Sequence, residues 1–277
     1  MTVIGRLAGR NCMIVGGTEG IGLASARRFL EEGARLVVTG RTADSTRQAL
    51  ERLRPLGDVY ALTAEVADPS SIEAAFREAL ERLGGRLDVL FHVAGISGRR
   101  FGDGPLHDCT TEGWQTVLDT NARGTFLTNR AAVRWMLGQE IDPNGLRGTI
   151  LNTGSVLGHS PAPEFFGTVA YAASKGALRA LTRSAAACYA PQRIRINLLS
   201  PGLIDTPMAA RAVGDPAIRG YLAGKQPIAG GPGTADDCAE AALFLCEPAS
   251  RFITGVELTV DGGWCVTEGQ YLGADPR

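Results

Sequence analysis

Short apolar runs alternate with longer amphipathic stretches along almost the whole of this sequence. The apolar runs are rich in β-branched side chains, which favour strands, and the stretches between them have the spacing of helices. Several of these stretches end at glycine or just before proline, as helices often do. Strands that alternate with helices imply right-handed crossovers and a parallel sheet. We therefore predict an α/β fold: one doubly wound parallel sheet of about seven strands, with helices on both faces.

The expected elements follow one another without a break that would separate two domains. Strands are predicted at residues 12–15, 35–39, 59–63, 87–93, 149–153, 194–198 and 256–260. Helices are predicted at residues 21–32, 45–53, 70–83, 112–137, 171–189 and 235–246. No internal repeat, low-complexity tract or linker divides the chain. We therefore expect a single domain over residues 1–277, which ends in a C-terminal extension at residues 266–277.

Two long connections interrupt this rhythm, at residues 96–111 and 206–234, and each follows a predicted strand. In open α/β sheets, ligands bind outside the carboxyl ends of the strands. Long loops in compact domains are also often functional. We therefore expect both connections to border a ligand site. The alternative is that they are surface loops with no part in function.

Charge and cysteine usage exclude several classes of protein. The 28 basic and 29 acidic residues nearly cancel, which argues against a broad surface for nucleic acid or anionic membranes, although a local basic patch would still fit. The six cysteines are scattered and do not cluster with histidines, so we expect no disulfide framework and no metal site. The chain shows no signal peptide and no transmembrane segment. These features predict a soluble protein of the reducing cytoplasm.

The first predicted strand runs directly into a glycine-rich turn, VGGTEGIG at residues 15–22, and a helix follows. Glycines let the backbone approach a pyrophosphate closely, and the amides at the helix N-terminus then meet its negative charge. The position of this turn, after the first strand of a β–α–β series, is typical of a dinucleotide site. A turn that needs small residues only for packing is the alternative.

Tyr171 and Lys175 are four residues apart on a predicted helix, so their side chains share one face. A free phenol has a pKa of about 10, which is too high for ready proton exchange at neutral pH. A lysine cation, together with the positive nicotinamide of an oxidised dinucleotide, would lower that pKa. Taken alone, this spacing is usually a surface pair.

Two further polar residues are placed to join this pair. Ser155 follows the predicted fifth strand, where its hydroxyl would reach the same cleft and bond a substrate carbonyl. Asn121 lies inside the predicted helix at residues 112–137, close to Gly124. Asparagine and glycine are both unfavourable within a helix, and local rules broken together often mark a functional site.

Together these motifs resemble the short-chain dehydrogenase/reductase family, in its single-domain Tyr-x-x-x-Lys branch, over about residues 10–264. Val15 stands where the glycine turn of the family usually has threonine. Residues 92–95 (HVAG) stand where the family commonly has Asn-Asn-Ala-Gly, and residues 201–206 and 260–263 match its nicotinamide-side segment and its final strand. The matches to its catalytic tetrad are Asn121, Ser155, Tyr171 and Lys175.

The resemblance implies a Rossmann-type fold and an NAD(P)-dependent oxidoreductase that interconverts a ketone and a secondary alcohol. Tyr171 would be the general acid or base, and Lys175 would lower its pKa and bind the nicotinamide ribose. Ser155 would orient the substrate oxygen, and Asn121 would hold a water that links Lys175 to solvent. Members of the family usually form dimers or tetramers. The resemblance therefore implies a homo-oligomer, up to a homotetramer, built through the helices at residues 112–137 and 171–189 and the last strand.

Two kinds of alternative stay open at this point. A catalytically inactive nucleotide-binding sensor or scaffold would share the fold, although the complete tetrad argues against it. Within the enzymes, the substrate would be a small carbonyl or alcohol. A 3-oxoacyl thioester reductase and a dehydrogenase of cyclic alcohols or diols both fit the sequence.

The end of the second strand predicts which dinucleotide is bound. NAD-using relatives carry an acidic residue there, whereas this chain has Gly40 followed by Arg41 and Thr42. Arg41 would fork onto a 2′-phosphate with help from the Thr42 hydroxyl, while Glu19 in the glycine turn would repel that phosphate. We therefore predict NADP as the preferred cofactor and NAD as the alternative. The residues expected to contact the cofactor are Gly16, Thr18, Glu19, Gly20, Ile21, Gly22, Arg41, Glu65, Val66, Ala94, Gly95, Tyr171, Lys175, Pro201, Gly202, Ile204 and Thr206.

Departures from the family pattern lie beside the site. His92 replaces the first asparagine of the family motif, and we expect a structural role for it rather than a catalytic one. The segment that leads from Ser155 to the tyrosine is about three residues longer than usual. The extra length makes His159, Phe165 and Phe166 candidate pocket residues, unless they only pack the loop.

Two adjacent arginines, Arg99 and Arg100, follow the fourth predicted strand in the first long connection. Guanidinium groups in a loop that overhangs a pocket would recognise a carboxylate or a phosphate on the substrate. Two solvated cations without a ligand are the alternative.

Overall fold

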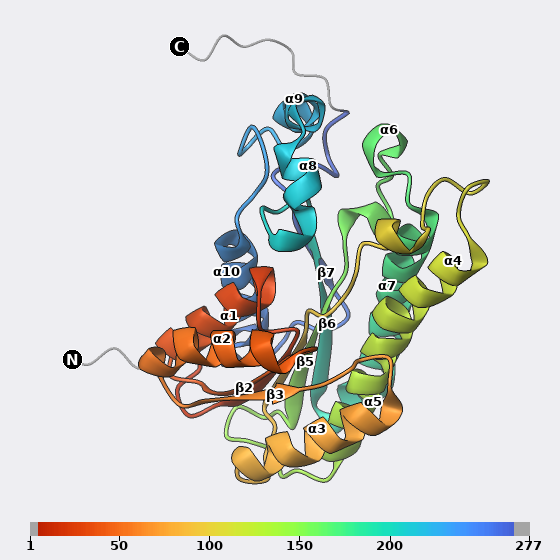
Figure 1. Cartoon of the computed structure of the whole chain (residues 1–277). Coiled ribbons are helices and arrows are strands. Elements are labelled where there is room, and N and C mark those ends of the chain that lie inside the picture. Colours follow the sequence, from red (N-terminus) through yellow and green to blue (C-terminus); the bar gives the residue numbers. More distant parts are fainter. Residues whose placement is uncertain (1–4, 269–277) are drawn as a thin grey trace, which may run out of the picture.

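The apolar runs form seven parallel strands, arranged across one sheet in the order β3-β2-β1-β4-β5-β6-β7 (Figure 1). The computed structural model describes residues 5–268. All seven predicted strands are confirmed. The strands are β1 (Asn11–Val15), β2 (Arg35–Gly40), β3 (Val59–Thr63), β4 (Val89–His92), β5 (Gly148–Thr153), β6 (Ile194–Pro201) and β7 (Glu257–Val260).

Helices connect these strands and cover both faces of the sheet. The α-helices are α1 (Gly20–Glu31), α2 (Ala43–Leu53), α3 (Pro69–Arg82), α4 (Thr111–Val117), α5 (Gly124–Leu137), α6 (Pro163–Phe166), α7 (Val169–Tyr189), α8 (Ala210–Gly214), α9 (Pro216–Lys225) and α10 (Ala235–Cys246). Single-turn 3₁₀ segments are η1 (Arg54–Leu56), η2 (Arg99–Phe101), η4 (Val156–Gly158), η5 (Ala190–Gln192), η6 (Pro207–Ala209) and η7 (Pro248–Ser250). No helix among residues 5–268 combines the length and the apolar character that crossing a membrane requires.

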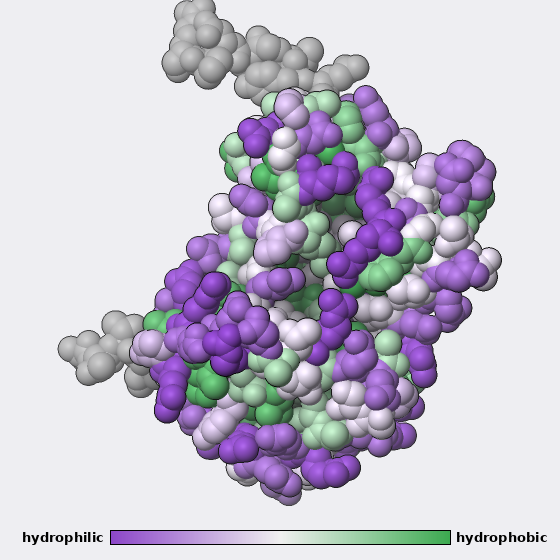
Figure 2. All heavy atoms as spheres, viewed as in Figure 1, coloured by the Kyte–Doolittle hydropathy of each residue, from purple (hydrophilic) through white to green (hydrophobic). Residues whose placement is uncertain are grey.

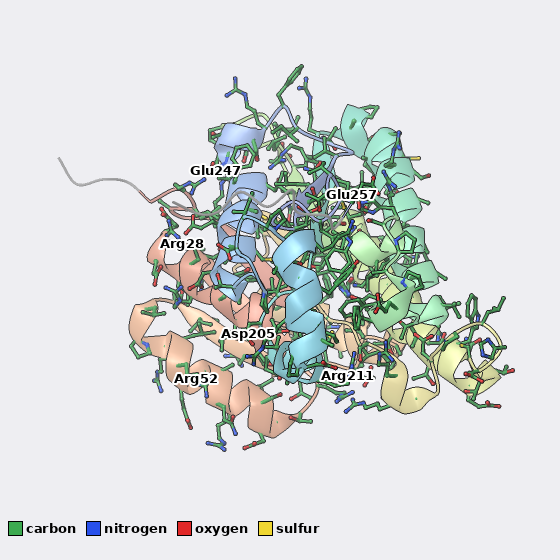
Figure 3. All side chains as sticks on the ribbon, turned by 90° about the horizontal axis from the view of Figure 1, so that it is seen from above. Arg28, Arg52, Asp205, Arg211, Glu247 and Glu257 are labelled. Atoms are coloured by element: carbon green, nitrogen blue, oxygen red, sulfur yellow. The ribbon has the colours of Figure 1, made fainter. Side chains whose placement is uncertain are left out.

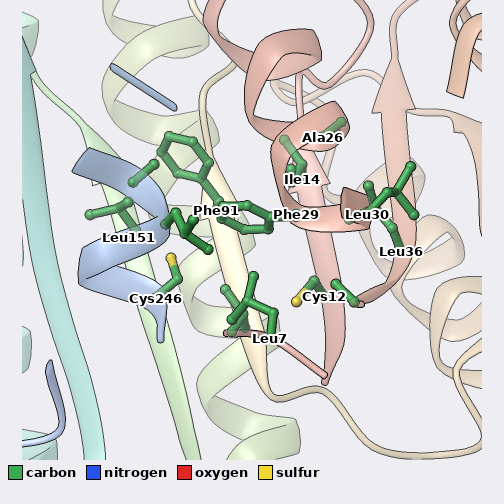
Figure 4. Packing of buried hydrophobic residues seen from close by; sticks show 14 of the residues in the cluster. Leu7, Cys12, Ile14, Ala26, Phe29, Leu30, Leu36, Phe91, Leu151 and Cys246 are labelled. Carbon is green, nitrogen blue, oxygen red and sulfur yellow. The ribbon is translucent and has the colours of Figure 1, made fainter. Parts of the chain in front are cut away.

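Alternate side chains of each central strand enter two separate hydrophobic cores. Ile14 of β1 packs with residues of α1 and α10 on one face, where the rings of Phe29 and Phe91 stack 6.4 Å apart (Figure 4). Met13, its neighbour in β1, packs with residues of α3 and α5 on the opposite face. Because both faces are buried, the strands read as continuous apolar runs in the sequence.

Helices α1 and α10, which are far apart in the sequence, lie side by side on the first of these faces. Ion pairs join them across the surface, one of which links Arg27 and Asp236 at 2.8 Å. Arg28 pairs in the same way with Glu240. Each such exposed pair contributes at most about 1 kcal/mol, so the buried apolar contact holds the two helices together.

The prediction of one helix over residues 112–137 is wrong in detail. A π-helical turn, η3 (Leu118–Arg123), separates α4 from α5 and contains the buried Asn121. The side-chain hydroxyl of Thr125 donates to the main-chain oxygen of Asn121 at 2.7 Å. The π turn thus widens the helix locally at Asn121 without separating α4 from α5 by a loop.

The long connection at residues 206–234 is not a loop throughout, as the sequence suggested. It contains the helices α8 and α9, and α9 begins at Pro216 with the Asp215 side chain accepting from the Ala217 amide at 2.9 Å. Proline is favourable in the first turn of a helix, so Pro216 suits the start of α9. Of the expected C-terminal extension, residues 266–268 are described and form no helix or strand, and the rest lies outside the described residues.

Candidate active site

Three neighbouring elements bring the four tetrad residues together at the carboxyl ends of β4 and β5. Ser155 follows β5, Tyr171 and Lys175 lie on α7, and Asn121 comes from the π turn η3. The Lys175 ammonium donates to the main-chain oxygen of Thr153 at 2.8 Å and lies 5.6 Å from the centre of the Tyr171 ring. The Ser155 side chain lies close enough to the Tyr171 phenol to act on its pKa. Residues from separate parts of the chain therefore form one cluster.

Asn121 braces this cluster from behind. Its side-chain oxygen accepts from the Ile96 amide at 2.8 Å, and its side-chain nitrogen donates to the Ile96 oxygen at 3.0 Å and to the Ser174 hydroxyl at 3.1 Å. These bonds tie the segment after β4 to α7, beside Tyr171 and Lys175. The side chain is fully buried, so its amide acts on the position of the two elements.

Burial acts on the two titratable groups in opposite directions. Burial lowers the pKa of the Lys175 ammonium to about 8. Burial also raises the pKa of the Tyr171 phenol above its usual value, and the nearby Ser155 side chain opposes that rise. The Lys175 ammonium lies over the ring and bonds Thr153, and the expectation that it lowers the phenol pKa together with a bound nicotinamide stays a prediction.

The glycine-rich turn is packed too closely for any larger residue. A Cβ atom on Gly22 would lie 2.0 Å from the Gly16 oxygen, and one on Gly16 would lie 2.6 Å from the Ala94 nitrogen. Glu19, at the N-cap of α1, makes no hydrogen bond with its side chain to the first turn. The amides at this helix start therefore have no side-chain partner, which suits a pyrophosphate.

The other expected cofactor residues lie at the carboxyl ends of adjacent strands. Arg41 follows β2, Glu65 and Val66 follow β3, and Ala94 and Gly95 follow β4. Pro201 is the last residue of β6, and the segment after this strand contains Gly202, Ile204 and Thr206. A Cβ on Gly20 would lie 3.2 Å from Thr206, so the glycine turn and the segment after β6 meet. Thr18 and Ile21 belong to the turn itself, and the resulting row of residues suits an extended dinucleotide.

His92 has the structural role that we expected. Its ring is buried, with Nδ1 2.9 Å from the Thr128 hydroxyl and Nε2 3.1 Å from the Ala94 oxygen. Burial is the main cause that lowers the pKa of this imidazole to about 3, and the nearby Lys175 charge adds to it. A ring that is neutral at pH 7 therefore joins β4 to α5.

The sequence did not reveal a second polar brace between the central strands and the helices. The side-chain amides of Asn129 in α5 and Asn152 in β5 bond each other at 2.8 and 3.1 Å. Asn152 also donates to the Thr182 hydroxyl of α7 at 3.0 Å. Both asparagines are buried and lie far apart in the sequence, so periodicity does not reveal that they bond each other.

The candidate pocket residues of the longer segment have different partners. Phe165 and Phe166 pack against Tyr221 of α9 and Trp264, with ring centres 5.2 to 5.8 Å apart. His159 instead lies 3.4 Å from the Cys265 sulfur and 3.3 Å from a Glu257 oxygen. The sequence pointed to Phe165 and Phe166, but not to the aromatic partners from α9 and the C-terminal segment.

This aromatic cluster forms part of an outer wall above the tetrad. Figure 2 shows that the molecule is indented between the part formed by α8 and α9 and the part that carries α4 and α6. The strands of the sheet lead into the base of the same region in the ribbon view, and Ser155 directly follows β5 (Figure 1). A substrate would therefore enter between α8 on one side and the η2–α6 side on the other.

Comparisons with known proteins match nearly the whole of the chain. A family model described as "Enoyl-(Acyl carrier protein) reductase" matches residues 15–265. A 2,5-dichloro-2,5-cyclohexadiene-1,4-diol dehydrogenase of Sphingobium indicum is 33% identical over 94% of this chain and 98% of its own. A glucose 1-dehydrogenase of Gluconobacter oxydans is 33% identical over 93% and 92%. The crystal structure of a short-chain type dehydrogenase/reductase from Mycobacterium marinum superposes with a TM-score of 0.82 at 29% identity, covering 94% of this chain and 97% of that one.

Proposed function

Because this chain belongs to the short-chain dehydrogenase/reductase family, whose members act on CH–OH and C=O groups with NAD(P), we propose that Tyr171 is its general acid and base and that NADP is its preferred cofactor. The reaction interconverts a ketone and a secondary alcohol. The observation that carries the proposal is the clustering of Ser155, Tyr171 and Lys175 after β5 and on α7, where Lys175 lies over the Tyr171 ring and Asn121 bonds the Ser174 hydroxyl of the same helix.

Each tetrad residue has a distinct task in this proposal. Tyr171 gives its phenolic proton to the substrate oxygen in reduction and takes it back in oxidation. Ser155 donates a hydrogen bond to the same oxygen and stabilises the negative charge that develops there. Lys175 is charged at neutral pH, since its pKa is about 8, and it places a positive charge beside the phenol. Asn121 positions α7, and we propose that it also holds the water that links Lys175 to solvent.

A bound nicotinamide would supply or accept the hydride and, in its oxidised form, add a positive charge beside the phenol. The chain itself provides the glycine turn and uncapped helix start for the pyrophosphate, and the segment after β6 for the nicotinamide end. Lys175 would bind the nicotinamide ribose.

The preference for NADP rests on the end of β2. A Cβ on Gly40 would lie 2.5 Å from the Thr18 side chain, so an acidic residue does not fit there as the turn now stands. Arg41, the next residue, forms no ion pair within residues 5–268 and is exposed. Thr42 differs from the expectation because its hydroxyl already caps α2, accepting from the Ser45 amide at 3.2 Å. Arg41 alone would therefore meet the 2′-phosphate.

The names of similar proteins give support to both substrate classes that the sequence left open. The matched relatives include dehydrogenases of a cyclic diol and of glucose, which supports a cyclic alcohol or diol as substrate. The description of the family model supports the thioester alternative. An inactive nucleotide-binding protein is disfavoured because the catalytic cluster is complete.

Replacement of Tyr171 by phenylalanine tests the general acid and base. Tyr171→Phe removes the proton donor and leaves the ring, so we expect turnover to fall by roughly 10²–10⁴-fold while NADP affinity and the unfolding transition stay unchanged. Steady-state kinetics with a panel of ketones and alcohols measures turnover, and fluorescence titration measures cofactor affinity. Turnover within threefold of the parent would remove Tyr171 from this role.

The cofactor preference is tested by Arg41→Ala. Loss of one charge-assisted phosphate contact costs about 1.5–3 kcal/mol, so kcat/KM with NADP should fall roughly 10- to 150-fold and change little with NAD. Both values are measured in the parent and in the variant. A parent that prefers NAD, or equal losses with both cofactors, would contradict the assignment.

A further inference from the structure

Two arginines from distant parts of the chain come together at the entrance to the candidate site. Arg99 belongs to η2, and Arg211 belongs to α8. Figure 3 shows Arg211 between α8 and the yellow segment that contains η2. The Arg99 side chain bonds the main chain of Phe165, whose ring lies 5.2 Å from that of Tyr221 in α9, the helix that directly follows α8. Burial is the main cause that lowers the pKa of the Arg99 guanidinium, and the charge of Arg211 adds to it. The sequence singled out Arg99 but gave no sign of its second partner.

Neither guanidinium group is neutralised by the described part of the chain. Neither forms an ion pair with an acidic side chain of residues 5–268. Asp103, the acid that acts on Arg99, is buried and uses its two oxygens to accept from the Ala170 and Tyr171 amides at 3.0 and 2.9 Å. Its carboxylate is therefore committed to the first turn of α7, and two like charges remain near each other.

Arg99 is held in place by a contact of its own. Its side-chain Nη2 donates to the main-chain oxygen of Phe165 in α6 at 2.7 Å. Arg100 lacks such a role, because its guanidinium lies over the Phe101 ring at 4.7 Å. One of the two adjacent arginines is thus fixed on the η2–α6 side of the entrance, and the other is stacked within its own loop.

The position of the pair relates it to the reacting groups. The loop of Arg99 is tied through Asp103 to the main chain of Tyr171, the proposed proton donor. Helix α8 follows Thr206, which lies against the glycine turn at Gly20. The two arginines therefore belong to segments that contact the proposed proton donor and the glycine turn, respectively.

We propose that Arg99 and Arg211 bind an anionic group, a carboxylate or a phosphate, at the end of the substrate away from its carbonyl. An anion between two guanidinium groups removes their mutual repulsion and accepts several charge-assisted hydrogen bonds. This inference rests on the proposed function and narrows it to acidic ketones and hydroxy acids or their phosphate counterparts.

Matched substrates separate charge from shape. A series of keto acids of increasing chain length is compared with the methyl esters of the same acids and with keto alkyl phosphates. The parent should prefer the anionic member of at least one pair, and the acid and phosphate arms identify which anion is bound. A parent that turns over esters as well as acids and phosphates would overturn the proposal.

Arg99→Gln and Arg211→Gln are compared with Arg100→Gln, a matched control from the same loop. We expect each of the first two to lower kcat/KM for the anionic ketone by roughly 10- to 100-fold, as for one charge-assisted hydrogen bond, and to change the ester value less than threefold. Arg100→Gln should leave both values unchanged. Equal losses for acid and ester, or an effect confined to the KM of NADP, would contradict a substrate role.

A binding measurement keeps this inference separate from the proposed function. Calorimetry with the cofactor-loaded protein measures the affinity for the same keto acids in the parent and in the Arg99→Gln/Arg211→Gln double variant. Weaker binding by the double variant supports the anion site even if no ketone or alcohol is turned over, a result that would refute only the proposed function. Equal affinity in parent and variant overturns the anion site.

Discussion

Burial disfavours the charged forms of both Tyr171 and Lys175. The proposed catalysis nevertheless needs a charged Lys175 and a Tyr171 that can lose its proton. The lysine keeps its charge at neutral pH because its pKa falls only to about 8. The phenol has a raised pKa, although the nearby Ser155 side chain opposes the rise. A proton would therefore leave Tyr171 readily only when further positive charge is bound beside it, which would couple proton transfer to cofactor binding.

His92 gives a prediction on stability at the same scale. Its folded pKa of about 3 lies below the usual value of 6.5, so the unfolded chain binds more protons between these pH values. The stability due to the neutral ring is complete above pH 6.5 and is lost as the pH falls. Between pH 6.5 and 5 the loss is about 2 kcal/mol, from 1.36 kcal/mol per pH unit.

The variant His92→Asn places the residue that the family commonly has at this position and removes the titrating group. The difference in unfolding free energy between parent and variant, measured by urea denaturation at pH 7 and pH 5, should shift by about 2 kcal/mol in favour of the variant. A difference that is the same at both pH values would mean that His92 is not buried as a neutral ring.

At the scale of elements, periodicity predicted the strands, whose position depends on side-chain burial. It missed boundaries and turns that depend on local hydrogen bonds. Strands such as β1 and β4 are buried on both faces and stand out as apolar runs. Even so, β4 begins at Val89 instead of residue 87, because the Leu87 amide bonds the Gln139 side chain at 2.7 Å. The π turn around Asn121 and the start of α9 at Pro216 are accompanied by side-chain bonds from Thr125 and to Asp215, local features that no average over a window can detect.

The candidate site divides in the same way. Its tetrad and glycine turn could be predicted because each motif lies within one short stretch of sequence. Arg211, Tyr221 and Trp264 carry no local signal. They join the site only because α8, α9 and the C-terminal segment fold over the strand ends.

The contact between β2 and the glycine turn gives a prediction on cofactor choice. Gly40→Asp alone forces a Cβ within 2.5 Å of Thr18, so the turn must shift and kcat/KM should fall with both cofactors. The double variant Gly40→Asp/Thr18→Gly relieves this contact, and the carboxylate then bonds the ribose hydroxyls. We expect its ratio of NADP to NAD efficiency to fall at least tenfold below that of Thr18→Gly, the control. A single Gly40→Asp variant that uses NAD at full efficiency would refute this account.

At the scale of the whole molecule, two apolar surfaces stay exposed on the described chain. One includes Phe126 and Trp135 of α5, each about two-fifths exposed. The other lies beside the edge strand β7 and includes Phe252, which is fully exposed, and Val256, which is about two-fifths exposed. These are the helix and strand through which we expected a homo-oligomer, and we propose that both surfaces are subunit contacts.

Sedimentation velocity checks this proposal. The parent should have a mass well above the 29.1 kDa of one chain, and a tetramer should become a dimer in either Phe126→Glu or Phe252→Glu. Leu106→Glu is the control, since Leu106 is 80% exposed on a separate loop and should leave the mass unchanged. A monomeric parent would contradict the proposal.

The pairing of α1 with α10 has a consequence for how the protein is made. The sheet face that holds Ile14 and Phe91 is closed partly by α10, which is synthesised about 200 residues after α1. At 5–20 residues per second, translation leaves this apolar face incomplete for roughly 10–40 s. We expect the growing chain to bind chaperones during that interval. The part of the sheet around β1 and α1 should become stable only when α10 has emerged from the ribosome.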